Sequence, residues 1–258
     1  MHYINQKHST GNVLHGVDPR VKLLSALVLL VMVISGKGVI FPLVTAALGV
    51  ILCLLMGKRP CTIALRFAEP GLIIIVVMML KLFTEGHTPL FSFTLAGMEI
   101  TGYREGLREG ILIAGRISGA VAVVTTLVFA TPFTELMAAF AWLRIPRTFI
   151  DIALFAWRYL FLLFDDARVI YGAQKNRLGY TGYRRGLRSF GTLTGSLIIK
   201  AFDNSRNITT AMVQRGYDGS MPKLLHKPFR AAEIAASLAF LACMGILWLA
   251  TLAEKGFL

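Results

Sequence analysis

Two arginines, Arg177 and Arg215, give the strongest chemical signal in this sequence. Each follows an alanine by four residues, and a glycine and a tyrosine come shortly after it. Glycine ends helices, and a cation is favoured at a helix C-terminus, so the pattern predicts two helices that end in arginine. A lone instance is explained by helix capping, whereas two instances favour docking on a protein partner through the planar guanidinium. The candidate docking residues are Ala173, Arg177, Gly179, Ala211, Arg215 and Gly216.

Three further charged residues, Arg116, Asp151 and Arg158, lie in apolar surroundings. Arg116 interrupts an apolar run, and a charge inside a membrane is a functional hypothesis by default, although near the outer end it can reach the interface. Asp151 and Arg158 are seven residues apart, about two helical turns, and we expect a structural ion pair there or with a neighbouring helix. Whether Arg116 and Arg158 are structural or functional stays open at this point.

Enzymatic and metal chemistry find little support in the sequence. It has no phosphate-binding GxxxxGK[ST] motif and no HExxH, so ATP hydrolysis would require a separate subunit. The three cysteines match no disulfide framework or CxxC metal spacing. Met1 and His2 carry nitrogen ligands that suit cobalt or nickel, but no acidic or cysteine ligand is nearby, so we expect no metal site and no cofactor.

The composition is that of a membrane protein. Hydrophobic residues make up 55% of the 258-residue chain and charged residues only 16%, well below the roughly 25% of soluble domains. The net charge of +13 does not indicate a nucleic-acid partner, because 15 of the 27 lysines and arginines fall in residues 131–231. Such clustering is typical of cytoplasmic segments.

These residues must be positioned by about five membrane spans and one inserted block of helices. The apolar runs predict four spans within a membrane domain of residues 1–130, with a polar connection at 84–109. Asp18 and Pro19 are a plausible start of the first span, from which Arg20 and Lys22 would reach the interface. The predicted spans are 19–35, 39–56, 67–83, 110–130 and, in the last part of the chain (232–258), 232–251.

Residues 131–231 read as a cytoplasmic domain of three helices, at about 133–143, 148–177 and 185–215. The third helix has an apolar stripe at spacings of three, four and seven, as in an amphipathic helix. With this block inside, the N-terminus is inside and the C-terminus outside. The sequence therefore predicts an all-α integral membrane protein with an inserted cytoplasmic domain.

A family resemblance covers nearly the whole chain. The segment from Leu14 to Leu23, Thr131-Pro132 with Leu143-Arg144-Ile145-Pro146, and the two arginine ends resemble the transmembrane T component of energy-coupling factor (ECF) transporters, in the cobalt/nickel-type CbiQ branch. The family's paired signature is Ala-Arg-Gly; this chain has Asn176-Arg177-Leu178-Gly179 at the first site and Gln214 before Arg215 at the second.

The resemblance implies a non-catalytic coupling subunit in the cell membrane. Its implied partners are two cytoplasmic ATPase subunits that receive Arg177 and Arg215, a substrate-binding membrane subunit of cobalt/nickel type, a small accessory membrane subunit, and membrane lipids. Two alternatives remain: a stand-alone secondary transporter or channel, which needs polar groups at mid-membrane, and an integral membrane enzyme that uses Arg158, Asp165 and Asp166. We expect no nucleic-acid partner.

Overall fold

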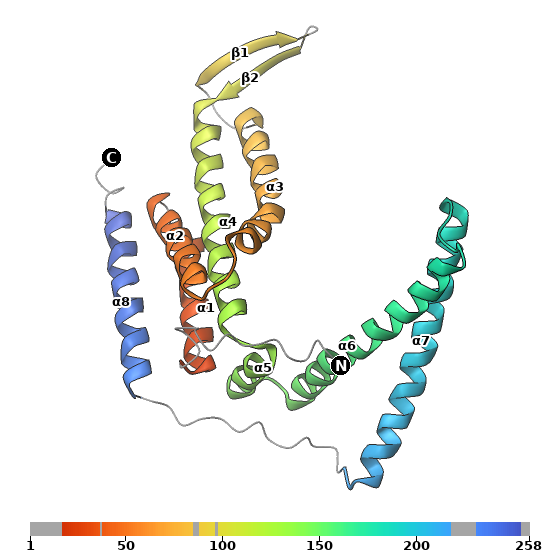
Figure 1. The fold of residues 1–258 in the computed structure, drawn as a ribbon. Coiled ribbons are helices and arrows are strands. Elements are labelled where there is room, and N and C mark those ends of the chain that lie inside the picture. Colours follow the sequence, from red (N-terminus) through yellow and green to blue (C-terminus); the bar gives the residue numbers. More distant parts are fainter. Residues whose placement is uncertain (1–16, 37, 85–87, 96–97, 218–230, 254–258) are drawn as a thin grey trace. The chain divides into compact units, whose positions relative to one another are not determined.

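The structure, a computed structural model, describes residues 17–36, 38–84, 88–95, 98–217 and 231–253. This part of the chain is helical apart from one hairpin of two strands, as Figure 1 shows, and the predicted all-α membrane fold is confirmed. Its elements are α1 (Pro19–Ser35), α2 (Ile40–Leu55), α3 (Pro60–Thr84), β1 (Pro89–Leu95), β2 (Met98–Tyr103), α4 (Arg104–Ala130), α5 (Phe133–Trp142), α6 (Arg147–Asn176), α7 (Tyr183–Gln214) and α8 (Ala231–Ala253).

The predicted polar connection at 84–109 contains a hairpin of β1 and β2, which the all-helical prediction did not include. The strands are antiparallel, with Leu95 paired to Met98 and Ser92 to Thr101. Residues 91–95 alternate apolar and polar, which is the strand period. The glutamates make the segment polar as a whole, and for that reason its strands were not predicted.

The chain divides into two compact units, and the division falls inside α5. Unit 1 consists of residues 1–139 and 227–258, and unit 2 of residues 140–226. Unit 1 therefore holds α1 to α4, the hairpin and α8. Unit 2 holds the long helices α6 and α7.

The core of unit 1 lies where α1, α2, α4 and α8 meet. Val33 and Phe41 are fully buried there, next to Val123 and Met244. Glycine allows α2 and α4 to pack closely: a methyl group added at Gly49 would lie 2.8 Å from the Cβ of Ala122. Such contacts leave no room for adjustment, so the middle of α4 is held firmly against α2.

Among the described residues, three helices are long and apolar enough to cross a bilayer: Pro60–Thr84, Arg104–Ala130 and Ala231–Thr251. Residues Ile40–Leu55 form a shorter apolar helix, and α1 has 17 residues. Large apolar side chains such as Leu65, Leu72 and Ile246 are at least two-thirds exposed, as expected of surfaces that face lipid. The chain is a multi-pass membrane protein, and the total of five spans stays a prediction.

Helix starts follow local capping chemistry where the sequence supplies it. The Asp18 carboxylate accepts a hydrogen bond from the backbone N–H of Arg20 at 2.9 Å, and Pro19 occupies the first helical position, as predicted for the first span. Helix α3 begins at Pro60, seven residues before the predicted span of 67–83, and α4 begins six residues before the predicted 110. The added residues of α4 are mainly charged, whereas those of α3 include Ile63, Ala64 and Leu65.

Candidate functional site

Helix α6 ends at Arg177 in a Schellman motif, the common C-terminal turn of helices. The N–H of Gly179 donates to the carbonyl of Gln174 at 2.9 Å, and the N–H of Leu178 donates to that of Lys175 at 3.0 Å. Arg177 is the C-cap residue, and Leu178 takes the left-handed position with φ 58°. The two bonds satisfy carbonyls that the helix end would otherwise leave unpaired.

Helix α7 ends at Arg215 in the same motif. The N–H of Tyr217 donates to the carbonyl of Met212 at 3.0 Å, and that of Gly216 donates to Val213 at 3.0 Å. Arg215 is again the C-cap, and here glycine occupies the left-handed position, with φ 78°. The one-residue offset of glycine between the two sites therefore leaves the backbone geometry around each arginine the same.

Gly179 is required for a different reason from Gly216. A methyl group added at Gly179 would lie 2.7 Å from the hydroxyl of Ser189 and 2.9 Å from the Gln174 carbonyl, whereas one added at Gly216 would meet nothing within 4 Å. The close approach places the end of α6 against the first turns of α7. From the sequence pattern alone, both glycines were predicted to end their helices in the same way.

Hydrogen bonds tie the end of α6 to the beginning of α7. The amide of Gln174 donates to the Ser189 carbonyl at 3.0 Å, and the Ser189 hydroxyl donates to the Gly179 carbonyl at 2.8 Å. The Tyr180 hydroxyl donates to the side-chain oxygen of Gln174 at 2.7 Å. Gln174 and Ser189 were not among the predicted site residues, because the sequence of one helix does not show which residues contact another helix.

The two arginine side chains project into the surroundings. Arg177 and Arg215 are exposed, as are Ala173 and Ala211 one turn earlier, and no described residue forms an ion pair with either guanidinium. The first end lies against Ser189 near the start of α7, and the second is the end of α7. At 1.5 Å per residue, the stretch from Ser189 to Arg215 is on the order of 40 Å long.

The remaining candidates of α6 do not come together. Asp151 is half-buried and Arg158 is exposed, and no described residue forms an ion pair with either, so the predicted pair is not observed. Asp166 does pair across the helices, with Lys200 of α7 at 2.5 Å. Beside this pair, α6 and α7 line a groove of about 420 Å³ that runs from Phe155 and Tyr159 to Tyr217.

Arg116 of unit 1 caps the end of another helix. Its Nε and one terminal nitrogen donate to the carbonyl of Gly36 at 3.1 and 2.6 Å, and Gly36 is the C-cap of α1. The guanidinium thus meets the negative end of the α1 dipole. We expected Arg116 to reach the outer interface, but its guanidinium binds a backbone carbonyl within the protein.

Lys22 forms the matching contact in the opposite direction. It is 7% exposed, and its ammonium donates to the carbonyl of Ala130, the last residue of α4, at 3.2 Å. We expected Lys22 to reach the membrane interface, whereas it turns into the protein. Helices α1 and α4 therefore run antiparallel, and each carries a cation that caps the C-terminus of the other. We call the Lys22–Ala130 and Arg116–Gly36 contacts the reciprocal caps.

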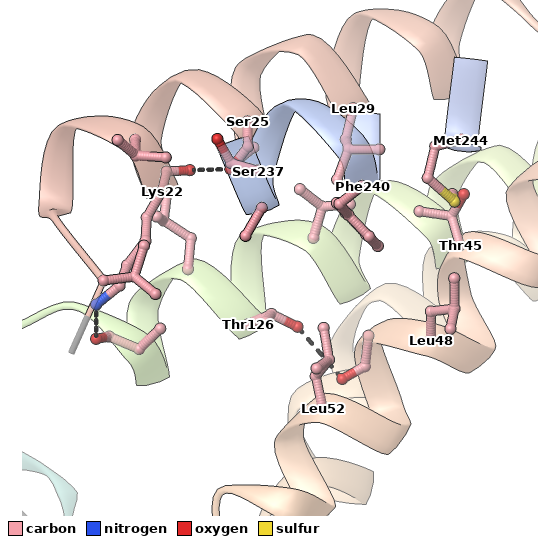
Figure 2. Close-up of a pocket in the computed structure, with 18 of the residues that line it drawn as sticks. Lys22, Ser25, Leu29, Thr45, Leu48, Leu52, Thr126, Ser237, Phe240 and Met244 are labelled. Atoms are coloured by element: carbon pink, nitrogen blue, oxygen red, sulfur yellow. Dashed lines mark hydrogen bonds between the residues drawn. The ribbon is translucent and has the colours of Figure 1, made fainter. Parts of the chain in front are cut away.

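An apolar cavity of about 440 Å³ adjoins one of the reciprocal caps. It lies among α1, α2, α4 and α8, and Lys22 lines one end of it, as Figure 2 shows, while Met244 lies toward the other. At the Lys22 end, the Glu233 carboxylate of α8 accepts a hydrogen bond from the Asp18 N–H at 2.8 Å. The starts of α1 and α8 and the end of α4 thus meet at one level of unit 1.

Comparison with known proteins identifies the family. A model of the CbiQ family, described as cobalt transport protein, matches residues 10–224. The chain belongs to the CbiQ family. In the part of the chain that the structure describes, no three metal-ligating side chains gather, and all five histidines lie outside that part.

Individual CbiQ-like relatives cover most of the chain. A protein of Methanocaldococcus jannaschii named uncharacterized protein MJ1089 is 31% identical over 87% of this chain and 84% of its own length. The cobalt transport protein CbiQ of Salmonella typhimurium is 30% identical over 59% and 69%, respectively. The energy-coupling factor transporter transmembrane protein EcfT of Staphylococcus aureus is 26% identical over 85% of both. The chain is therefore a component of a membrane transport system.

Proposed function

We propose that this CbiQ-family chain is the transmembrane coupling subunit of an ATP-driven ECF-type importer for cobalt or the related ion nickel. In this role it converts closure of two cytoplasmic ATPase subunits into movement of a substrate-binding membrane subunit. The chain itself is non-catalytic, and a small accessory membrane subunit belongs to the same complex. Family membership supports the transport role, and the names of the relatives support the metal.

The observation that carries the proposal is the pair of arginine ends with the same turn geometry. Both arginines are exposed C-cap residues, fixed by two backbone hydrogen bonds each. The fixed turns set the position of each arginine backbone, and the exposed guanidinium can bind a carboxylate or carbonyl of a partner. Since α7 separates the two ends by on the order of 40 Å, each end serves a different subunit.

The same geometry suggests how force is transmitted. Contacts with Ser189 fix the end of α6 to the beginning of α7, so a push on Arg177 reaches one end of α7 and a push on Arg215 reaches the other. The pair of Lys200 and Asp166 joins the helices between these points. ATP-driven approach of the two ATPase subunits therefore shifts Arg177 and Arg215 relative to each other, and the joined helices pass this movement on to the membrane spans.

The proposed orientation places residues 131–231 and the N-terminus in the cytoplasm and the C-terminus outside. The accumulation of lysine and arginine in residues 131–231 supports it. Single cysteines at positions 177 and 215, in a background without Cys61 and Cys243, should react with a membrane-impermeant maleimide only in inside-out vesicles. Labelling of either position from the outside would contradict the whole proposal.

The decisive experiment reverses both charges together. The double variant Arg177→Glu with Arg215→Glu should lower recovery of the ATPase subunits with the tagged membrane complex by at least about tenfold and abolish ATP-dependent Co²⁺ uptake. The matched control, Arg188→Glu with Arg206→Glu, makes the same change in net charge at exposed positions within α7 and should retain the ATPase subunits. Recovery and transport at the wild-type level in the Arg177/Arg215 variant would refute the docking role.

Two residues on which the alternative functions relied, Arg116 and Asp166, make structural contacts. The transporter or channel alternative depended on Arg116, whose guanidinium binds the Gly36 carbonyl. The enzyme alternative depended on Arg158, Asp165 and Asp166, of which Asp166 pairs with Lys200. We therefore keep the coupling subunit as the single proposed function.

A further inference from the structure

We propose that Lys22 is a positioning residue for energy coupling: its ammonium holds the C-terminal end of α4 on α1, where the chain leaves the membrane helices for α5, the helix that leads into unit 2. This inference rests on the proposed function and adds a residue to it outside the arginine ends. The contact concerned is the hydrogen bond from the Lys22 Nζ to the Ala130 carbonyl at 3.2 Å.

Burial makes the Lys22 contact strong. A lysine that is 7% exposed has lost most of its hydration, so it needs compensating partners within the protein. The carbonyl of Ala130 is one such partner and carries the negative end of the α4 dipole. Burial itself disfavours the charge, and the carboxylates of Glu135, Asp18 and Glu233 partly offset this effect. Glu135 lies in α5, so one of these carboxylates comes from the helix that follows α4.

Packing around α4 is uneven along its length. In the middle of the helix, a methyl group added at Gly119 would lie 2.9 Å from the Pro42 carbonyl, and Ala122 abuts Gly49 equally closely. Near the end of α4, Thr126, Leu127 and Ala130 line the apolar cavity of about 440 Å³ instead. The end of α4 thus has free volume on one side, and Lys22 bonds directly to its last residue.

The residue after Ala130 also marks this junction. The Thr131 hydroxyl is buried and has no hydrogen-bond partner among the described residues. Buried polar groups are usually hydrogen-bonded, so the Thr131 hydroxyl lacks the partner that a protein interior normally supplies. A closely packed middle, a cavity beside the end and an unpaired hydroxyl together describe a helix end that can move when its cap is released. Lys22 therefore determines how much of a movement of unit 2 is transmitted to α1 and α8.

The test compares transport with ATP hydrolysis in the complete complex. Lys22→Met keeps the length of the side chain and removes the charge, whereas Lys22→Arg keeps the charge. In proteoliposomes, we expect Lys22→Met to retain the ATPase subunits and ATP hydrolysis within about twofold, while Co²⁺ uptake per ATP hydrolysed falls about tenfold. Lys22→Arg should restore at least about half of the uptake per ATP. Lys81→Met, which removes a partly exposed cation paired with Glu109, is the control and should behave as wild type.

A chemical variant covers the case in which Lys22→Met does not assemble. Lys22→Cys, in a background without Cys61 and Cys243, can be treated with bromoethylamine to form a thioether side chain that ends in an ammonium group. Uptake per ATP should rise after this treatment and stay low after treatment with a neutral alkylating agent. Equal uptake per ATP in all Lys22 variants would show that Lys22 is only structural. A wild-type complex that hydrolyses ATP without importing Co²⁺ would instead contradict the proposed function.

Discussion

Units 1 and 2 use the same electrostatic principle in opposite ways. In both, cations stand at the negative ends of helices. In unit 1 the cations come from a different helix: Lys22 of α1 caps α4, and Arg116 of α4 caps α1. In unit 2 each arginine belongs to the helix that it ends, and its side chain is exposed. A cation that caps the C-terminus of a neighbouring helix joins the two helices, whereas a cation at the end of its own helix stays available for a partner.

The largest expected effect is on the internal caps. Arg116→Leu removes both hydrogen bonds to Gly36 and leaves a buried carbonyl without them, which should destabilise unit 1 by about 2–4 kcal/mol. Thermal unfolding of the purified protein in detergent would measure this. The exposed Arg108→Leu on the same helix is the control, with a change within about 0.5 kcal/mol. Equal stability of the two variants would mean that the reciprocal caps do not hold α1 and α4 together.

The next effect distinguishes the two glycines of unit 2. Gly179→Ala places a methyl group against the Ser189 hydroxyl and the Gln174 carbonyl and should cost about 1–3 kcal/mol. Gly216→Ala meets open space but has to adopt φ 78°, which should cost about 1 kcal/mol. Hydrogen exchange of residues 174–190 should accelerate only in Gly179→Ala. Equal acceleration in both variants would contradict the difference between the two ends.

A smaller effect is expected where α6 and α7 are joined by charge. Lys200→Met removes the ion pair with Asp166, in which the lysine side chain is half exposed. Exposed pairs contribute at most about 1 kcal/mol, and salt weakens them. We expect a correspondingly small loss of stability at low ionic strength that shrinks at high salt. A loss that does not depend on salt would assign the effect to side-chain packing.

The smallest effect is a gain. Leu178 occupies the left-handed position that glycine fills at the second end, and a side chain there is unfavourable. Leu178→Gly should therefore stabilise the α6 turn, by roughly 0.5 kcal/mol after the greater freedom of glycine in the unfolded chain is counted. Slower hydrogen exchange at residues 177–180 would confirm this. Faster exchange would show that the leucine makes a contact that outweighs its backbone strain.

Helix type and most helix limits follow from the sequence, because apolar periodicity and local caps are short-range signals. Asp18 and Pro19 start α1 as predicted, and both arginines end their helices as predicted. The docking role of the six site residues remains a prediction. The hairpin at 89–103 was missed although its alternation is visible in the sequence.

Contacts between distant segments could not be read in the same way. Lys22 and Ala130 are 108 residues apart, and no feature of either segment predicts a contact with the other. From the sequence we predicted that Lys22 and Arg116 reach the membrane–water interface, since a membrane helix considered alone offers them no better partner. Only the antiparallel packing of α1 on α4 supplies the carbonyls. The same holds for Gln174 and Ser189, whose roles depend on the approach of α6 and α7.

The reciprocal caps also constrain how the length of the membrane helices can change. Lys22 and Gly36 are separated by the same number of residues as Arg116 and Ala130, about 21 Å of helix in each case. An inserted residue within either stretch would turn one end by about 100° relative to the other. One cap would then point away from its carbonyl. Adaptation of this protein to a thicker bilayer therefore requires matched insertions in both helices, or added length outside the stretch between the caps.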